Sequence, residues 1–229
     1  MSMLPKGQKP LLRDEQRKWI KEKDEECTFD PSTEGQAQLI NARSCELNKT
    51  AIRARELEWM GRNIGSGDTV VAYKASSLTE NGTMQAIAII RRANSPNGET
   101  CDLIAMESSG GSFKATAMSN SLVDCKYNEV TRRAEWMQLN DSLHFGVEEF
   151  SYVNQRARGY DKFTFGYSRQ RGEWHLLSAS TVFPQYNEQL DEMDAITSKV
   201  EYQRDFNWVS LGSFRADEIG ELLEKRRHR

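Results

Sequence analysis

The sequence lacks long hydrophobic runs, and it lacks an excess of either charge. No segment approaches the roughly 18–20 apolar residues that span a bilayer, so no membrane span is expected. The 31 basic and 34 acidic residues nearly cancel. Because nucleic-acid binding draws on a basic surface, this balance argues against a nucleic-acid partner.

The first residues also lack the apolar core of a signal peptide. Two alternatives follow: the protein is cytosolic, or a leader was removed from an exported protein. The cysteines help to choose between these two compartments.

The four cysteines lack the Cys-x-x-Cys spacing of a zinc site or a redox motif, and they form two near pairs, Cys27 with Cys45 and Cys101 with Cys125. Disulfides within these pairs would close loops of 18 and 24 residues. Each disulfide would raise the free energy of unfolding by about 3 kcal/mol in the chain-entropy model. The alternative is four reduced cysteines that act as small hydrophobes in a cytosolic core. We favour the two disulfides, and with them an oxidising compartment, the periplasm.

Histidine is scarce, and its three positions, His144, His175 and His228, are too scattered to suggest a metal site. No metal and no cofactor is expected.

Two amphipathic helices are predicted at the start of the chain. Residues 11–27 place Leu12, Trp19, Ile20 and Cys27 at helical intervals among strong helix formers. A break with a proline follows at residues 28–32, and a second helical run covers residues 36–60. Helices joined by a short loop should lie antiparallel, so a Cys27–Cys45 bridge would clamp the loop end of a hairpin.

After Gly67 the period becomes strand-like, with eight candidate strands at residues 69–73, 84–90, 101–106, 112–118, 142–147, 161–167, 173–182 and 199–206. Turn signals separate them, for example at residues 95–98 and 171–172, where glycine suits a positive φ. A last helix is predicted at residues 215–225. The predicted fold class is therefore α+β, with a helical hairpin at 1–66 and a mostly antiparallel β-rich domain with a C-terminal helix at 67–229.

No grouping of residues supports catalysis strongly. Glu148 and Glu149 are adjacent, and in a strand they would point to opposite faces. His175 lies between apolar neighbours, and no serine or cysteine motif supplies a nucleophile beside it. Gly-x-Ser-x-Gly, Gly-x-x-x-x-Gly-Lys and His-Glu-x-x-His do not occur. No catalytic residue is therefore assigned, and an enzyme is the weaker hypothesis.

A binding segment is predicted at residues 154–162, which join two apolar strands. Arg156, Arg158 and Tyr160 are residue types that favour contact hot spots between proteins. The alternative is a mobile, hydrated loop without a partner.

The N-terminal third resembles a known family. A Gln16-Arg17-Lys18-Trp19 helix, Cys27, a variable loop, and Cys45 followed by a Thr50 to Leu57 helix resemble the second half of the lysozyme-inhibitor LprI-type domain, a secreted helical bundle. The resemblance covers about 50 residues. It implies a Cys27–Cys45 disulfide and hairpin-packing roles for Trp19, Thr50, Arg53 and Leu57. Members of that family usually carry an earlier helical half with another cysteine pair. The sequence does not include this half, so part of the inhibitor surface is expected to be missing.

The β-rich part resembles, weakly, a loose group of periplasmic β-domains of Gram-negative bacteria. Composite proteins of this kind include candidate immunity partners of toxins, among them toxins delivered by type VI secretion. The resemblances imply a periplasmic inhibitor that occludes the active site of a cell-wall hydrolase or of a cognate toxin. The alternatives are an envelope enzyme with a cleft around His144, His175 and the acids Glu148, Glu149 or Asp161, and a structural module that binds the envelope.

Overall fold

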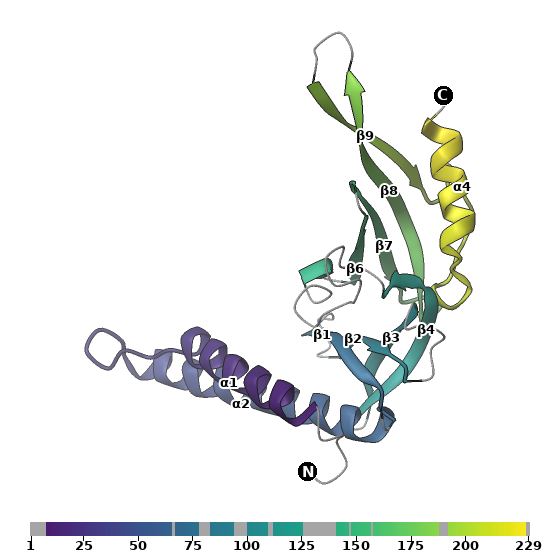
Figure 1. Cartoon of the computed structure of the whole chain (residues 1–229). Coiled ribbons are helices and arrows are strands. Elements are labelled where there is room, and N and C mark those ends of the chain that lie inside the picture. The colour runs from purple at the N-terminus through teal and green to yellow at the C-terminus, as the bar shows by residue number, and fades with distance from the viewer. Residues whose placement is uncertain are drawn as a thin grey trace. The chain divides into compact units, whose positions relative to one another are not determined.

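The structure is a computed structural model, and it describes residues 8–65, 67–77, 83–93, 100–109, 112–125, 141–146, 148–156, 158–187 and 192–227. The chain divides into two compact units, which are described separately. The first takes Met1–Gly67 and Gly110–Phe113, and the second takes Asp68–Ser109 and Lys114–Arg229. Figure 1 colours the elements along the chain.

The first unit is a helical hairpin of α1 (Gln8–Glu26) and α2 (Gln36–Asn63). Pairs of opposite charge four residues apart support α1, namely Lys18 with Glu22 and Lys21 with Glu25, each at 3.7 Å between nitrogen and oxygen. Such exposed pairs add only about 0.3–0.5 kcal/mol each. The hairpin therefore depends on the contact between its two helices and on the Cys27–Cys45 disulfide that joins them.

The second unit contains two antiparallel sheets, each a meander in which consecutive strands pair. The four-stranded sheet has the order β1-β2-β3-β4, from β1 (Thr69–Ser77), β2 (Met84–Arg91), β3 (Thr100–Ser109) and β4 (Ser112–Asp124). The five-stranded sheet has the order β5-β6-β7-β8-β9, from β5 (Leu143–Gly146), β6 (Glu149–Gln155), β7 (Tyr160–Ser168), β8 (Glu173–Asn187) and β9 (Glu192–Glu201).

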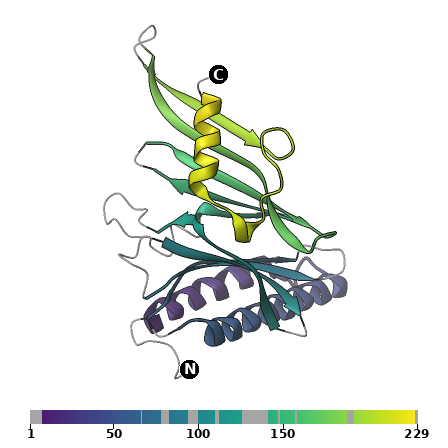
Figure 2. The ribbon, with the colours of Figure 1, turned by 90° about the vertical axis from the view of Figure 1, so that its right-hand side faces the viewer.

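One core joins the two sheets to a helix, α4 (Ala216–Arg227), and to a short 3-10 turn, η2 (Leu211–Ser213). Alternate residues of β6, β7 and β8 point into this core, because side chains in a strand alternate between the two faces. The Trp174 ring lies 5.0 Å from that of Phe150, and Phe214 meets Phe163 edge to face at 5.1 Å. Figure 2 shows α4 against one face of the five-stranded sheet.

Polar contacts fix the ends of α4. The Ala216 backbone N–H donates to the Ser121 hydroxyl of β4 at 2.9 Å, which satisfies a free helix N-terminal donor. At the other end, Arg226 donates to Asp205 at 2.7 Å. The hydrogen bond from Arg204 is the largest cause that lowers the pKa of Asp205.

The predicted α+β class is confirmed, with a hairpin first, then antiparallel sheets and a C-terminal helix. One strand was not predicted, and another was predicted at the wrong residues. Residues 149–155 form β6, which was not predicted, and the strand predicted at 199–206 instead occupies Glu192–Glu201. The chain leaves β9 in a turn where Gln203 has a φ of 67°. Gly172 has the positive φ that its turn was predicted to need, whereas the turn predicted at 95–98 lies outside the described residues.

Candidate functional site

The loop end of the helical hairpin is held by a covalent link. Cys27 follows α1 and Cys45 lies within α2, and a disulfide joins them across a Cα–Cα distance of 5.6 Å, as predicted. A second disulfide joins Cys101 of β3 to Cys125, the other pair that the spacing predicts. Near the first disulfide, Lys49 of α2 pairs with Glu26 of α1. The end of one helix is thus fixed to the middle of the other.

The loop between the helices is ordered by one carboxylate. Asp30 accepts hydrogen bonds from the Ser32 backbone N–H at 2.9 Å, from its hydroxyl at 2.6 Å and from the Thr33 hydroxyl at 3.1 Å. Glu34 in turn accepts from the Asp30 backbone N–H at 2.8 Å. The Ser32 hydroxyl is the largest cause that lowers the pKa of Asp30. The loop therefore has a defined shape.

The contact between the helices mixes apolar and polar residues. Arg53 is buried and donates to Gln16 of α1 at 3.3 Å, while Trp19 and Leu57 are half-buried. The resemblance assigned Thr50 the same packing role, and this assignment was wrong. Thr50 is exposed, and its hydroxyl donates to the Glu46 carbonyl oxygen at 2.7 Å, because a threonine inside a helix can bond to the preceding turn.

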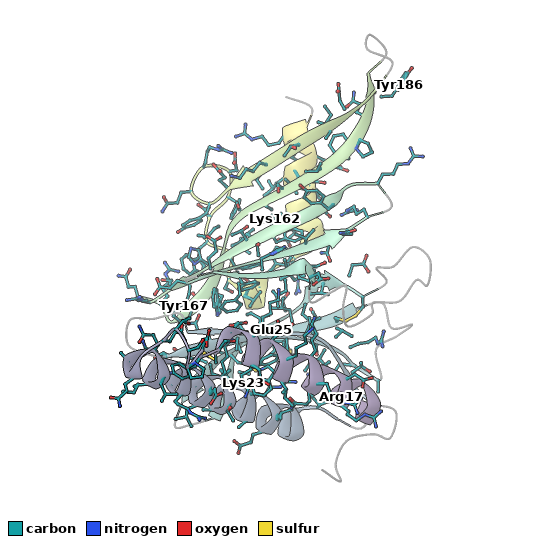
Figure 3. The ribbon with its side chains drawn as sticks, turned by 90° about the vertical axis from the view of Figure 1, so that its left-hand side faces the viewer. Arg17, Lys23, Glu25, Lys162, Tyr167 and Tyr186 are labelled. Carbon is teal, nitrogen blue, oxygen red and sulfur yellow. A yellow bond between two sulfur atoms is a disulfide. The ribbon has the colours of Figure 1, made fainter. Side chains whose placement is uncertain are left out.

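Large apolar side chains lie on the surface of the hairpin. Leu47 is 72% exposed, Ile40 is 64% exposed, and Ile20 of α1 is 48% exposed. Ile40 and Leu47 are seven residues apart and thus lie on the same face of α2. Figure 3 labels Arg17 and Lys23, which lie three positions before and three positions after Ile20 on α1. The hairpin thus presents apolar side chains among charged ones on its surface.

The segment predicted as a binding loop is a short turn between β6 and β7. The Arg156 backbone N–H donates to the Gly159 carbonyl oxygen at 3.1 Å, and the Arg156 guanidinium pairs with Asp161, which is buried. Gly159 has a φ of 91°, and a Cβ there would lie 1.8 Å from the Val182 carbonyl oxygen of β8. The turn is therefore tightly packed and needs glycine at this position.

The three predicted binding residues differ in their surroundings. All three are exposed, Tyr160 by 39%, but Arg156 is in addition held by its ion pair with Asp161. The three lie within five positions, around the turn between β6 and β7.

His175 belongs to an aromatic stack rather than to a reactive group. It is 9% exposed, its ring stacks on Trp208 at 3.9 Å, and Tyr202 meets it edge to face at 5.3 Å. The Arg171 guanidinium lies 4.1 Å from the Trp208 ring. Burial is the largest cause that lowers the pKa of His175.

Two of the three acids proposed to share a cleft with His175 form ion pairs with arginines. Asp161 pairs with Arg156, and Glu148 pairs with Arg169 from a turn where its φ is 55°. Glu148 lies in the turn before β6, and Glu149 is the first residue of that strand. His144 lies on β5, opposite Ser151 of β6.

No cluster of three or more histidine, cysteine, aspartate or glutamate side chains suited to a metal occurs in the described part of the chain. Within the same residues, no helix combines the length and apolar content that crossing a membrane requires.

A comparison with protein-family models explains the hairpin. Residues 2–57 match the model described as Lysozyme inhibitor LprI. Residues 2–57 are thus similar to an LprI-type domain, and they are called the LprI-type domain below. The match covers about a quarter of the chain, including α1, the disulfide and most of α2. No curated protein and no solved structure matches the chain.

The LprI-type domain carries surface residues that sequence reasoning did not single out. Leu39 and Ile40 are adjacent, and adjacent residues in a helix cannot both face the same partner helix. The adjacency of Leu39 and Ile40 could therefore have predicted that Ile40 lies outside the contact between the helices. Leu47, seven residues after Ile40, lies on the same face.

Proposed function

We propose that the protein is an inhibitor that binds a lysozyme-like hydrolase of the cell envelope and blocks its active site. The observation that carries this proposal is the match of residues 2–57 to the lysozyme-inhibitor family, on a hairpin that the Cys27–Cys45 disulfide closes. Binding by occlusion requires neither a cofactor nor a catalytic group in the inhibitor.

The exposed apolar residues of the LprI-type domain supply the contact. Leu47 and Ile40 share a face of α2, and both stand more than 60% exposed. Burying a leucine side chain contributes about 1.5–3 kcal/mol. The disulfide and the Asp30 hydrogen bonds order the hairpin before it meets the target, so less conformational entropy is lost on binding.

A second contact is proposed at the β6–β7 turn. Arg158 and Tyr160 are exposed there, and arginine and tyrosine are enriched among the residues that dominate binding energies. Arg156 has a supporting role, because its ion pair with Asp161 and its hydrogen bond to Gly159 hold the turn.

The same features support a location in the periplasm. The described residues contain two disulfides and no free cysteine, which suits an oxidising compartment. The periplasm is such a compartment, and it is where an inhibitor would meet a hydrolase that acts on the cell wall. A secreted toxin that attacks the cell wall is a target of the same kind. If the gene of such a toxin lies beside the gene of this protein, the protein would act as the immunity partner of that toxin.

The experiment uses the full chain and a c-type lysozyme as the probe. Inhibition is measured by the clearing of a cell-wall suspension, and affinity by calorimetry. Leu47→Glu should weaken binding at least about tenfold, because it places a charge in an apolar contact. Asn48→Glu, on the neighbouring exposed position, is the matched control and should change the affinity less than about threefold.

Two results would overturn the proposal. The first is no binding and no inhibition by the wild-type chain with lysozyme or with other wall hydrolases. The second is equal affinity for the wild type and for Leu47→Glu.

A further inference from the structure

The two faces of the five-stranded sheet differ in what covers them. Phe163 and Phe165 of β7 pack against Phe214, which lies two residues before α4. Because side chains in a strand alternate between its faces, Lys162 and Thr164 point to the opposite face, here called the outer face. Figure 2 shows α4 in front of the sheet, and Figure 3, seen from the other side, labels Lys162 with α4 behind the strands. The outer face is thus the face that α4 does not cover.

The register of the strands arranges the outer face in rows. The rows, each read from β6 to β9, are Ser151, Thr164, Ser178 and Glu201; Val153, Lys162, Ser180 and Lys199; and Gln155, Tyr160, Val182 and Thr197. Half of these residues carry a hydroxyl group. Directly opposed residues have Cβ atoms about 4.5–5.5 Å apart, so Ser180 lies within reach of the lysine on either side of it. The rows form a mostly polar surface about 14 Å wide, at about 4.8 Å between strands.

The charges of the outer face leave one lysine without an acidic partner. Glu201 pairs with Lys199 at 2.6 Å and with Arg204 at 2.9 Å, so the charge of Lys199 is offset. Lys162 is exposed, and within the described part of the chain its ammonium forms no ion pair. Glu149 of β6 is paired with β7 four positions beyond Lys162, about 14 Å away, which exceeds the Debye length of about 8–10 Å in physiological salt.

Charges on neighbouring residues do not reverse this sign. Asp161 of β7 and Asp194 of β9 have the opposite parity in their strands, so they point to the face that α4 covers. Asp161 is also paired with Arg156. Arg158, in the turn before β7, is exposed and adds positive charge beside the outer face. The surface around Lys162 is therefore weakly positive, although the net charge of the whole chain is −3.

Hydroxyl groups around a single unpaired ammonium match a particular class of ligand. A hydroxyl both donates and accepts hydrogen bonds, so it pairs with the hydroxyl and amide groups of a sugar polymer. An ammonium binds a carboxylate through charge-assisted hydrogen bonds, which are about twice as strong as neutral ones. An acidic protein or a nucleic acid brings many negative charges, and a face with one unpaired lysine is a poor match for them. A glycan with widely spaced carboxylates fits both features.

We infer that the outer face binds the glycan of the cell wall, with Lys162 on a carboxylate and with Ser180 and Thr197 on sugar hydroxyls. The wall glycan combines sugar rings with substituents that carry carboxylates at intervals, which is the chemistry that this face recognises. The contact uses none of the hairpin residues proposed to bind the hydrolase, and it holds the inhibitor on the polymer where such a hydrolase acts. The choice of the wall among anionic glycans rests on the proposed function, whereas the binding itself is measured without a hydrolase.

The test is cosedimentation of the full chain with purified, insoluble peptidoglycan. Lys162→Glu should raise the apparent Kd at least about tenfold, because it replaces an attraction for carboxylates with a repulsion. Lys114→Glu is the matched control, since Lys114 is an exposed lysine of β4 and its reversal makes the same change in net charge. This control should change the Kd less than about threefold. Thermal unfolding confirms that each variant is folded.

Two further measurements separate the carboxylate contact from the hydroxyl contacts. Peptidoglycan whose carboxylates have been converted to neutral amides should bind the wild type and Lys162→Glu with Kd values within about threefold of each other. Ser180→Ala with Thr197→Val leaves the charge unchanged and should raise the Kd for untreated peptidoglycan at least about fivefold, because two neutral hydrogen bonds are lost. Leu47→Glu should sediment like the wild type.

The outcomes distinguish this inference from the proposed function. If the wild type does not sediment with peptidoglycan, or if Lys162→Glu and Lys114→Glu have equal Kd values, the inference is overturned and the proposed function stands. Weaker inhibition of the hydrolase by Lys162→Glu with unchanged sedimentation assigns the outer face to a protein partner, which also overturns the inference. Sedimentation that depends on Lys162, in a chain that inhibits no hydrolase, supports the inference and refutes the proposed function.

Discussion

The Cys27–Cys45 disulfide should decide whether the LprI-type domain is folded. It closes a segment of 18 residues, which corresponds to about 3 kcal/mol of chain entropy in the unfolded state. The rest of the hairpin is weak: its ion pairs are exposed, and a 19-residue helix such as α1 is only marginal alone in water. Loss of about 3 kcal/mol should therefore open the hairpin while the β-rich unit stays folded.

Hydrogen exchange measured by mass spectrometry resolves this local event. In Cys27→Ser with Cys45→Ser, amides of α1 should exchange about 100-fold faster, the factor that corresponds to about 3 kcal/mol. Cys101→Ser with Cys125→Ser is the matched control. That bridge closes 24 residues in the other unit, so it should lower the urea midpoint of the β-rich unit and leave α1 unchanged. Unchanged α1 exchange in the first variant would refute the reasoning.

Three further predictions concern the β-rich unit. Gly159→Ala should cost at least about 2 kcal/mol in urea unfolding, because the new Cβ meets a carbonyl oxygen of β8, whereas Gly172→Ala, with a φ of 67° and open space around it, should cost about 1 kcal/mol. Equal costs would contradict this. Trp174→Ala removes a ring that is 1% exposed and should cost about 3–5 kcal/mol, measured in the same way. Burial lowers the pKa of His175 from its ordinary value of 6.5, so the unfolded state binds the proton more tightly than the folded state. The free energy of unfolding should therefore fall as the pH drops below that value. In melting temperatures measured from pH 7 to 5, His175→Phe should show a smaller fall than the wild type.

The helices and most strands were predictable from local patterns. Leu12, Trp19 and Ile20 recur at helical spacing, and cysteines mark the loop end of the hairpin. In β2, the apolar run from Ala86 to Ile90 indicates a buried strand, and β2 lies between β1 and β3. These signals depend on neighbours in the sequence, which is why they were sufficient.

Other features depend on the partners that strands find. β6 was missed because Glu148 and Glu149 resemble a turn, and the acidic start of β9 at Glu192 hid the first half of that strand. The pairing of β8 with β9 continues past the end of β7, from Phe183 opposite Ile196 to Asn187 opposite Glu192, and only the register reveals this difference in length.

The predicted contact residues illustrate the same limit. Arg156, Arg158 and Tyr160 were chosen by residue type, and the ion pair that sets Arg156 apart from the other two requires Asp161, five positions away on the next strand. Whether Arg158 and Tyr160 contact a partner stays a prediction.

The central claim is tested most directly by titrating a c-type lysozyme with the full chain while its lytic activity on a cell-wall suspension is recorded. The account predicts a stoichiometric loss of activity that Leu47→Glu weakens at least about tenfold and Asn48→Glu does not. Full lytic activity at saturating amounts of the correctly disulfide-bonded wild type, repeated with other wall hydrolases, would contradict it.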